Sequence, residues 1–229
     1  MKIHWLFKRI LFSIKQTPHR VWRVFVFKNY KFYQGYSFLT QLAAWFLLIS
    51  DALFVFDFFE ILTNLFSPNT RRLTKLEILR GQQVFGQIID FELVMLDKRS
   101  EFVRRGAAHA YVTFNTVNCF KPIAADIFIH ELTHIFQYQN FGAGYIALAL
   151  SAQKSAAGYN YAHTQDWRQA QSIFDFNAEQ QADLFQDYYR MKTQKKPAQW
   201  RAVFYNDAEI LEKLCKNAIE KSINLKISD

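Results

Sequence analysis

The sequence has few cysteines, and its first fifty residues contain no acidic side chain. The chain of 229 residues contains two cysteines, Cys119 and Cys215, which lie far apart in the sequence. This separation excludes a disulfide-rich framework and a zinc site built on cysteine pairs, and it leaves a single disulfide open. There are no internal repeats or low-complexity tracts. The length allows one large domain, or one domain with an appendage.

The lack of acidic residues in residues 1–50 makes the charge distribution uneven. The whole chain has 28 basic and 20 acidic residues, and the difference of eight equals the number of basic residues in this segment. They are Lys2, Lys8, Arg9, Lys15, Arg20, Arg23, Lys28 and Lys31. Such an asymmetry predicts a partner for the N-terminal segment. The segment lacks a recognisable nucleic-acid-binding motif, and we expect no nucleic-acid partner.

The start of the chain predicts a basic amphipathic helix. Apolar residues from Ile3 to Ile14 follow helical spacing, and Lys8, Arg9 and Lys15 lie off that stripe. This composition is typical of helices that lie on an anionic membrane surface. The alternative is an ordinary helix that packs its apolar stripe on the domain. Because Lys8 and Arg9 interrupt the apolar run, a cleaved secretory signal is not expected.

A long apolar run follows at residues 38–56, in which Asp51 is the only charged residue. Its length is near the roughly 20 residues that cross a bilayer. Asp51, and then Asp57 and Glu60, would be costly in hydrocarbon. If the run spans, the positive-inside rule places the N-terminus in the cytoplasm. We expect membrane association through residues 1–66, peripheral or with a single span; the alternative is a buried helix pair in a soluble cytoplasmic protein.

The first strong break lies at Ser67-Pro68-Asn69, and it divides the chain into residues 1–67 and 68–229. The second part reads as ordinary globular sequence with both helical and strand periodicity. Strands are predicted over 91–96 and 110–117, and helices over 72–85, 145–152, 176–185 and 207–223. A few strands among several helices predict an α+β fold.

Residues 126–137 carry the strongest functional signal, a His-Glu-x-x-His motif in an apolar background without helix breakers. On a helix, His130 and His134 lie one turn apart on the same face, so both imidazoles can reach one metal ion. Glu131 lies about 100° round the helix, where it can accept a proton from a water activated by the metal. The alternative is a helix with two surface histidines. The apolar flanks, and Pro122 near the helix start, favour a helix held against a core.

A third ligand is expected from further along the chain. Gln137 stands where a continuing His-x-x-Gly-x-x-His pattern would need glycine, so that pattern is excluded. Glu179 and Asp183 lie one turn apart on a second predicted helix. Catalytic zinc typically takes three protein ligands and a water, and two His with one Glu is a known set. Asp183 can then accept the N–H of a ligating imidazole. His163 is the alternative third ligand.

With these two motifs the sequence resembles the gluzincin class of zinc metallopeptidases, which pair a His-Glu-x-x-His helix with a later Glu-x-x-x-Asp helix. The resemblance implies that Zn²⁺ is held by His130, His134 and Glu179, with Glu131 as general base and Asp183 supporting a ligand. It also implies a zincin-like α+β domain, preceded by the apolar, basic helical segment, that hydrolyses bonds in a peptide or protein substrate. The motif region also looks like zincin-like bacterial proteins of poorly defined role.

The resemblance extends to two further features. Gluzincins commonly use a Tyr or His to polarise the carbonyl, which makes Tyr159, Tyr161 and His163 candidates, although each alone is more often structural. In zincins an edge strand beside the active helix receives the substrate as an added strand. The strand predicted at 110–117 is therefore expected to line the cleft, and the alternative is a core strand.

Two other functions are compatible with the same residues. One is a zinc-binding domain that keeps its site for structure or partner recognition without hydrolysis, tethered to a membrane by its N-terminal segment. The intact Glu131 argues against it, because a purely structural site needs no base. The other is a membrane-binding module in residues 1–66 attached to a degenerate enzyme.

Overall fold

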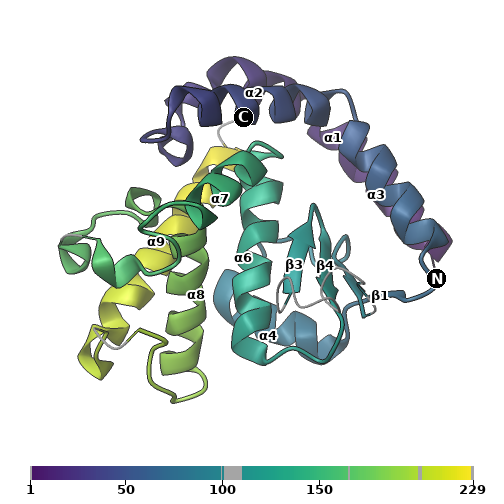
Figure 1. Cartoon of the computed structure of the whole chain (residues 1–229). Helices are drawn as coiled ribbons and strands as arrows, with labels where there is room; N and C mark the ends of the chain where they lie inside the picture. Colours follow the sequence, from purple (N-terminus) through teal and green to yellow (C-terminus); the bar gives the residue numbers. More distant parts are fainter. Residues whose placement is uncertain (1, 99, 101–109, 165, 201–202, 228–229) are drawn as a thin grey trace.

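The computed structural model describes residues 2–98, 100, 110–164, 166–200 and 203–227. It has helices and one small mixed sheet, which confirms the predicted α+β fold (Figure 1). The helices are α1 (Lys2–Val26), α2 (Phe38–Ala52), α3 (Val55–Phe66), α4 (Lys75–Phe85), α6 (Ala125–Phe141), α7 (Tyr145–Gln153), α8 (Ala178–Lys192) and α9 (Ala208–Ile227). The strands are β1 (Thr70–Arg72), β2 (Met95–Asp97), β3 (Ala110–Thr113) and β4 (Thr116–Cys119).

The sheet has the strand order β1-β2-β4-β3, which places β3 at one edge. β2 runs parallel to β4, and the other two pairings are antiparallel. The prediction of one strand over 110–117 is wrong, because β3 and β4 form a hairpin in which Thr113 pairs with Thr116. The turn places Phe114 at a positive φ of 55°. Non-glycine residues rarely adopt such an angle, so alternation alone could not indicate the turn.

Two other predicted boundaries also differ because of pairing across the chain. The helix predicted from residue 72 begins at Lys75, where Thr74 and Glu77 form a capping box. Arg72 instead belongs to β1 and lies opposite Met95. The strand predicted over 91–96 is shorter in the structure, because β2 begins at Met95 and ends at Asp97. Local periodicity does not reveal which residues find a partner strand.

Helix α6 lies at the centre of the molecule and packs against α4, α7, α8 and β3. Every residue from Phe128 to Phe141 is buried, polar side chains included. The helix begins three residues after Pro122, so this proline precedes the first turn rather than occupying it. It ends at Gly142, where φ is +84° and a Cβ would approach the Leu48 side chain to 2.8 Å. A helix this deeply buried can place its histidines only in the interior or in a cleft.

Helices α1, α2 and α3 form a layer on one side of the molecule, hereafter the N-terminal layer (Figure 1). α2 packs on α7, and α1 packs on both α2 and α3. The apolar run predicted at 38–56 is divided between α2 and α3, which meet at an angle of 69°. In the described part of the chain no single helix has the length and apolarity to cross a membrane, although this bent pair has them when taken together.

The apolar stripe of the first helix faces away from the body. Phe7, Ile10 and Ile14 are exposed, whereas Trp5 and Arg9 are buried. The alternative in which the stripe packs on the domain is therefore wrong. The two cysteines are buried free thiols, so the disulfide that the sequence left open does not form.

Candidate metal centre

Helices α6 and α8 bring the predicted ligand residues together. His130 and His134 lie on one face of α6, and α6 packs along α8. α8 begins at a capping box formed by Asn177 and Gln180, which fixes where its first turn starts. Glu179 lies in that first turn, where the helix dipole favours a carboxylate. Three side chains from two helices therefore converge on one point.

Their distances fit a shared metal ion. The Oε2 atom of Glu179 lies 3.4 Å from Nε2 of His130 and 3.4 Å from Nε2 of His134. Two ligands held about 2.0–2.1 Å from a tetrahedral ion are about 3.4 Å apart. Within the described residues this Oε2 atom is buried and has no hydrogen-bond partner. The three atoms are therefore spaced as ligands of one ion would be.

A hydrogen bond on the far side of each imidazole orients it. Nδ1 of His130 lies 2.9 Å from Oδ1 of Asp183, as the sequence predicts. The second oxygen of Asp183 accepts a bond of 3.1 Å from the indole N–H of Trp200. With Nδ1 donating to a carboxylate, the Nε2 atom of His130 keeps its lone pair for a metal. Trp200 has no recognisable signal in the sequence.

His134 is oriented by a residue that the sequence reasoning missed. Its Nδ1 lies 2.9 Å from Oε1 of Gln137, one turn along α6. The Nε2 group of Gln137 donates to the carbonyl oxygen of Ala178 at 2.9 Å, which fixes the amide with its oxygen toward the histidine. The spacing of three residues on one helix was the available signal. The carboxylate of Glu179 is held in turn, because its Oε1 accepts a bond of 2.8 Å from Gln153.

The charges at the centre are strongly coupled. Burial lowers the pKa of His130, but its hydrogen bond with Asp183 and the nearby carboxylate of Glu179 outweigh this and raise the pKa well above its usual value. The pKa of His134 is also raised, since Glu179 outweighs burial. Burial alone would raise the pKa of Glu179, and the two histidines bring it below its usual range instead. The carboxylate of Glu179 and the two imidazoles are therefore close enough to interact strongly.

Glu131 lies beside this cluster and is suited to accept a proton. It is buried, it lines the same cleft as the two histidines, and its Oε2 atom has no hydrogen-bond partner among the described residues. Burial raises the pKa of Glu131, and His130 and His134 offset this only in part. A carboxylate with a raised pKa is a better base near neutral pH.

The centre lies in a cleft of about 530 Å³. The cleft is lined by β3 and Phe114, by α6 and α7, and by Tyr159 and Glu179. The predicted strand at 110–117 was expected to line a cleft, and β3 does so from the edge of the sheet. An edge strand has unpaired N–H and C=O groups, so it can pair with an extended peptide.

Of the three candidates for polarising a carbonyl, one lies in the cleft. Tyr159 lines it, and its ring centroid is 6.0 Å from that of His130. Tyr161 is buried, and its hydroxyl donates to Asp187 at 2.8 Å. His163 is exposed, and neither it nor Tyr161 is among the described residues that line the cleft. Among the described residues, the group that could hold a metal ion contains Glu179 and not His163, which was the alternative third ligand.

Tyr145 is a cleft residue that the sequence reasoning missed. Its ring stacks on that of His134, with the centroids 6.0 Å apart. Burial raises its pKa, and the carboxylate of Glu131 raises it further, so its hydroxyl keeps its proton. Tyr145 opens α7, and the sequence predicted that helix without indicating that its first side chain reaches the cleft.

Comparison of the chain with protein-family models, with curated proteins and with solved structures found no match.

Proposed function

We propose that the protein is a zinc-dependent metallopeptidase that hydrolyses peptide bonds. The observation that carries this proposal is the convergence of Nε2 of His130, Nε2 of His134 and Oε2 of Glu179 at the spacing of tetrahedral ligands. Two histidines and one glutamate are a ligand set of catalytic zinc sites. A zincin-like arrangement of the domain is part of the proposal, and the two ligand-bearing helices beside a sheet with β3 at its edge support it.

The chain's own residues have separate tasks in this reaction. A bound zinc ion would polarise the scissile carbonyl and lower the pKa of a water molecule. Glu131 accepts the proton of the attacking water and passes it to the leaving amine. Asp183 and Gln137 hold the imidazoles with Nε2 directed at the metal position. Tyr159 and Tyr145, whose rings lie beside the two histidines, are hydroxyl donors of the cleft that can bind the developing oxyanion.

The proposed substrate is a peptide or protein segment in extended conformation. It would pair with β3 as an added strand, with its scissile carbonyl directed toward Glu131. Apolar side chains contribute to the cleft wall at Phe114, Ile146 and Leu150. A substrate with an apolar residue beside the cleaved bond is therefore favoured over one with charged residues there.

The test is metal analysis and peptidase assay of the full chain and two variants. The wild type should bind about one zinc ion and cleave fluorogenic peptides. Glu131→Gln should keep the metal and lose on the order of 10²–10⁴ in kcat, because the general base is removed. Glu179→Ala should lose most of the metal. Full activity in Glu131→Gln would refute the proposal, and unchanged zinc content in Glu179→Ala would refute the ligand set.

The alternative function is a zinc-binding domain that recognises a partner without hydrolysis. A closed structural site needs four protein ligands, whereas the cluster in the described part of the chain has three. The same experiment separates the two functions. Tight zinc binding, with peptidase activity absent from the wild type over a broad peptide library, would favour the non-catalytic function.

A further inference from the structure

The N-terminal layer has its polar side facing the body and its apolar side facing outward. On α3 the buried residues are Asp57, Glu60 and Asn64. On the same helix Phe58 and Phe66 are exposed, at 66% and 76%. A helix on the surface of a water-soluble protein has the opposite arrangement, with its apolar stripe against the core. In this layer the polar side chains therefore face the protein body and the apolar side chains face outward, which is the reverse of a helix on a water-exposed surface.

The outward apolar surface is concentrated in this one region. The described part of the chain has 25 exposed large hydrophobic side chains, and 19 of them lie between Phe7 and Phe66. They come from all three helices of the layer and include Trp22, Phe25 and Phe46. Soluble monomers rarely expose a contiguous apolar surface of this extent, and such surfaces mark contact with a partner or a membrane.

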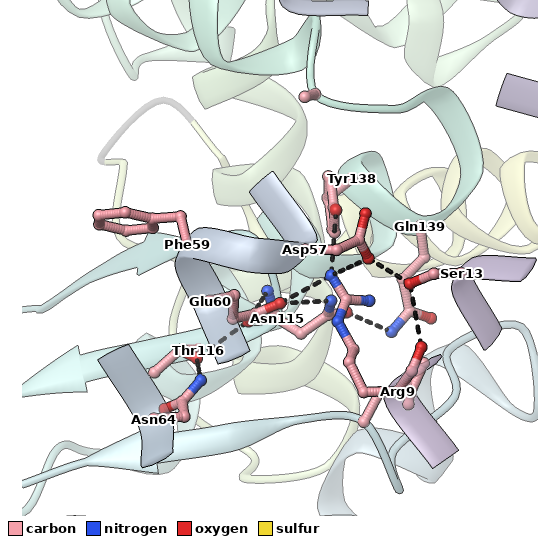
Figure 2. Close-up of polar contacts among 12 residues, drawn as sticks. Arg9, Ser13, Asp57, Phe59, Glu60, Asn64, Asn115, Thr116, Tyr138 and Gln139 are labelled. Atoms are coloured by element: carbon pink, nitrogen blue, oxygen red, sulfur yellow. Dashed lines mark hydrogen bonds and ion pairs between the residues drawn. The ribbon is translucent and has the colours of Figure 1, made fainter. Parts of the chain in front are cut away.

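The inward polar side is an ion-pair network. Nη2 of Arg9 lies 3.0 Å from Asp57 and 2.8 Å from Glu60. Asp57 also accepts hydrogen bonds from Ser13 and Arg20. Figure 2 shows the guanidinium of Arg9 among these carboxylates, while Phe59, from the same helix, points away from the network. These bonds hold the polar faces of α1 and α3 together.

The network also fixes the layer to the body. Oε1 of Glu60 accepts a bond of 2.8 Å from the backbone N–H of Asn115, at the tip of the β3–β4 hairpin. Arg9 donates to the hydroxyl of Tyr138 on α6 at 3.3 Å. Turning the layer over would expose these groups to the outside and break buried charge pairs, which is strongly unfavourable. The apolar side is therefore a permanent outer surface of the folded chain.

The charges on the outer surface identify what covers it. Residues 1–66 contain three acidic residues, Asp51, Asp57 and Glu60, and all three are buried. Lys15 and Lys28 are exposed. The exposed charges of residues 1–66 are thus all positive, and they lie in or next to a layer whose outer side is apolar. Two copies of this face would repel one another, whereas anionic lipid headgroups attract it and the acyl chains accept its apolar side chains.

The length of α2 and the bend between α2 and α3 indicate whether the layer lies in one side of the membrane or crosses it. α2 has 15 residues, which is about 22 Å of helix and shorter than the roughly 30 Å of a bilayer core. The bend of 69° after it turns α3 in another direction. A span through both helices would carry the buried Asp57 and Glu60, together with the hairpin that Glu60 binds, into hydrocarbon, at high cost.

We propose that the outer face of the N-terminal layer inserts into one leaflet of an anionic bilayer without crossing it, so that the body and its cleft stay at the membrane surface. The embedded side chains are the exposed apolar residues of α1, α2 and α3. The inward Arg–carboxylate network keeps the layer rigid while its other side is in lipid. This proposal is independent of the metal centre.

The first test is binding of the full chain to vesicles of phosphatidylcholine with phosphatidylglycerol. Sedimentation with the vesicles is expected, with a blue shift of the tryptophan fluorescence, and binding to phosphatidylcholine alone should be weaker. Phe25→Glu with Phe58→Glu should weaken binding by about tenfold or more, because two embedded side chains become charged. Leu79→Glu is the matched control, since Leu79 is 57% exposed on α4, outside the layer. It should bind as the wild type does.

The second test separates insertion in one leaflet from a span. Lys28→Cys and Pro68→Cys place thiols on either side of the α2–α3 pair, and both native residues are exposed. An impermeant maleimide should label both positions from the same side of sealed membrane vesicles, while the native Cys119 and Cys215 are buried. Labelling from opposite sides would overturn the proposal in favour of a span.

Two other results would also overturn it. One is a folded wild type that does not bind the anionic vesicles. The other is a wild type that forms a stable dimer in solution and does not bind lipid, with the dimer dissociating in the Phe25→Glu, Phe58→Glu variant. Loss of zinc or of peptidase activity leaves this proposal untouched, because neither readout involves the outer face of the layer.

Discussion

The candidate metal centre and the inner face of the N-terminal layer both bury carboxylates, and they differ in how many oxygens of those carboxylates have a hydrogen-bond donor. In the layer, both oxygens of Asp57 and both oxygens of Glu60 have a donor. In the centre, one oxygen of Glu131 and one of Glu179 have no hydrogen-bond partner among the described residues. Buried polar atoms are rarely left unpaired without a functional reason. The carboxylates of the network are therefore fully paired within the protein, whereas two carboxylates of the candidate centre keep one oxygen open to a ligand.

In the N-terminal layer the arginines face the protein body, whereas lysines such as Lys15 are exposed. The excess positive charge of residues 1–50 predicts an external partner, yet Arg9, Arg20 and Arg23 are buried against the body. Their partners include Asp51 and Asp57, in the following segment of the same chain. Arginine suits this role because its planar fork can bond several oxygens at once. The outward positive charge comes from lysines.

Replacing Arg9 with Met should have the largest effect on stability. The change leaves Glu60 and Asp57 buried with fewer partners, and we expect the free energy of unfolding to fall by about 3–5 kcal/mol. Urea unfolding of the full chain in mild detergent measures this. Lys15→Met, at an exposed position on the same helix, should change it by less than about 0.5 kcal/mol.

The double variant Arg9→Met with Glu60→Gln sharpens this result. If the ion pair carries the effect, removing both charges should recover part of the lost stability. Simple additivity of the two losses would mean that the pairing is not what stabilises the layer. Metal binding should be retained in each variant that folds, because neither residue is part of the centre.

Replacing Tyr159 with Phe should lower kcat by about 10²–10³ if its hydroxyl binds the oxyanion. Metal content should not change, since the hydroxyl is not a ligand. Tyr161→Phe is the matched control, because its hydroxyl bonds Asp187 outside the cleft. That control should keep kcat and lose about 1 kcal/mol of stability. Equal losses of kcat in the two variants would rule out a specific role for Tyr159, and Tyr145→Phe would then be the next variant to assay.

Replacing Asp183 with Asn should weaken zinc binding by about 10–100-fold, since the imidazole of His130 loses its charged acceptor. Competition with a chelator measures the affinity. Trp200→Phe should have a smaller effect in the same direction, because it removes only the donor to Asp183. Asp187→Asn, one turn further along α8, should leave the affinity unchanged. An unaltered affinity in Asp183→Asn would contradict the role of this carboxylate.

The smallest effect is expected at Glu77, a partly exposed acid paired with Arg71 through both of its oxygens. Burial raises its pKa, but the bonds from Arg71 and Thr74 outweigh this and lower the pKa from 4.5 to about 2. The stabilisation is therefore present above pH 4.5 and is lost as the pH falls toward 2.

Glu77→Gln should accordingly cost on the order of 1 kcal/mol at pH 6, a figure reduced by solvent screening, and less near pH 2.5. Unfolding of both proteins at the two pH values measures the difference. A difference that does not depend on pH would show that the charge of Glu77 does not contribute.

The local patterns of the sequence predicted the centre better than the sheet. His130, Glu131 and His134 are recognisable because their spacing is set by one helix. Glu179 and Asp183 follow from the same one-turn spacing on a second helix, and the structure brings Glu179 to the histidines. The hairpin at Phe114 was not predictable, because its positive φ is held by contacts with Phe56, Phe59 and Tyr138 from distant segments.

By itself, the sequence determined that the candidate ligand residues lie on helices and that the first helix is amphipathic. Spacing along one helix settles each of these. Only the tertiary structure decided which side of that first helix faces outward, since the direction depends on where Arg9 finds Asp57 and Glu60. It also decided which tyrosines reach the cleft and that Gln137 orients His134. Those outcomes depend on packing between elements far apart in the chain, which periodicity does not encode.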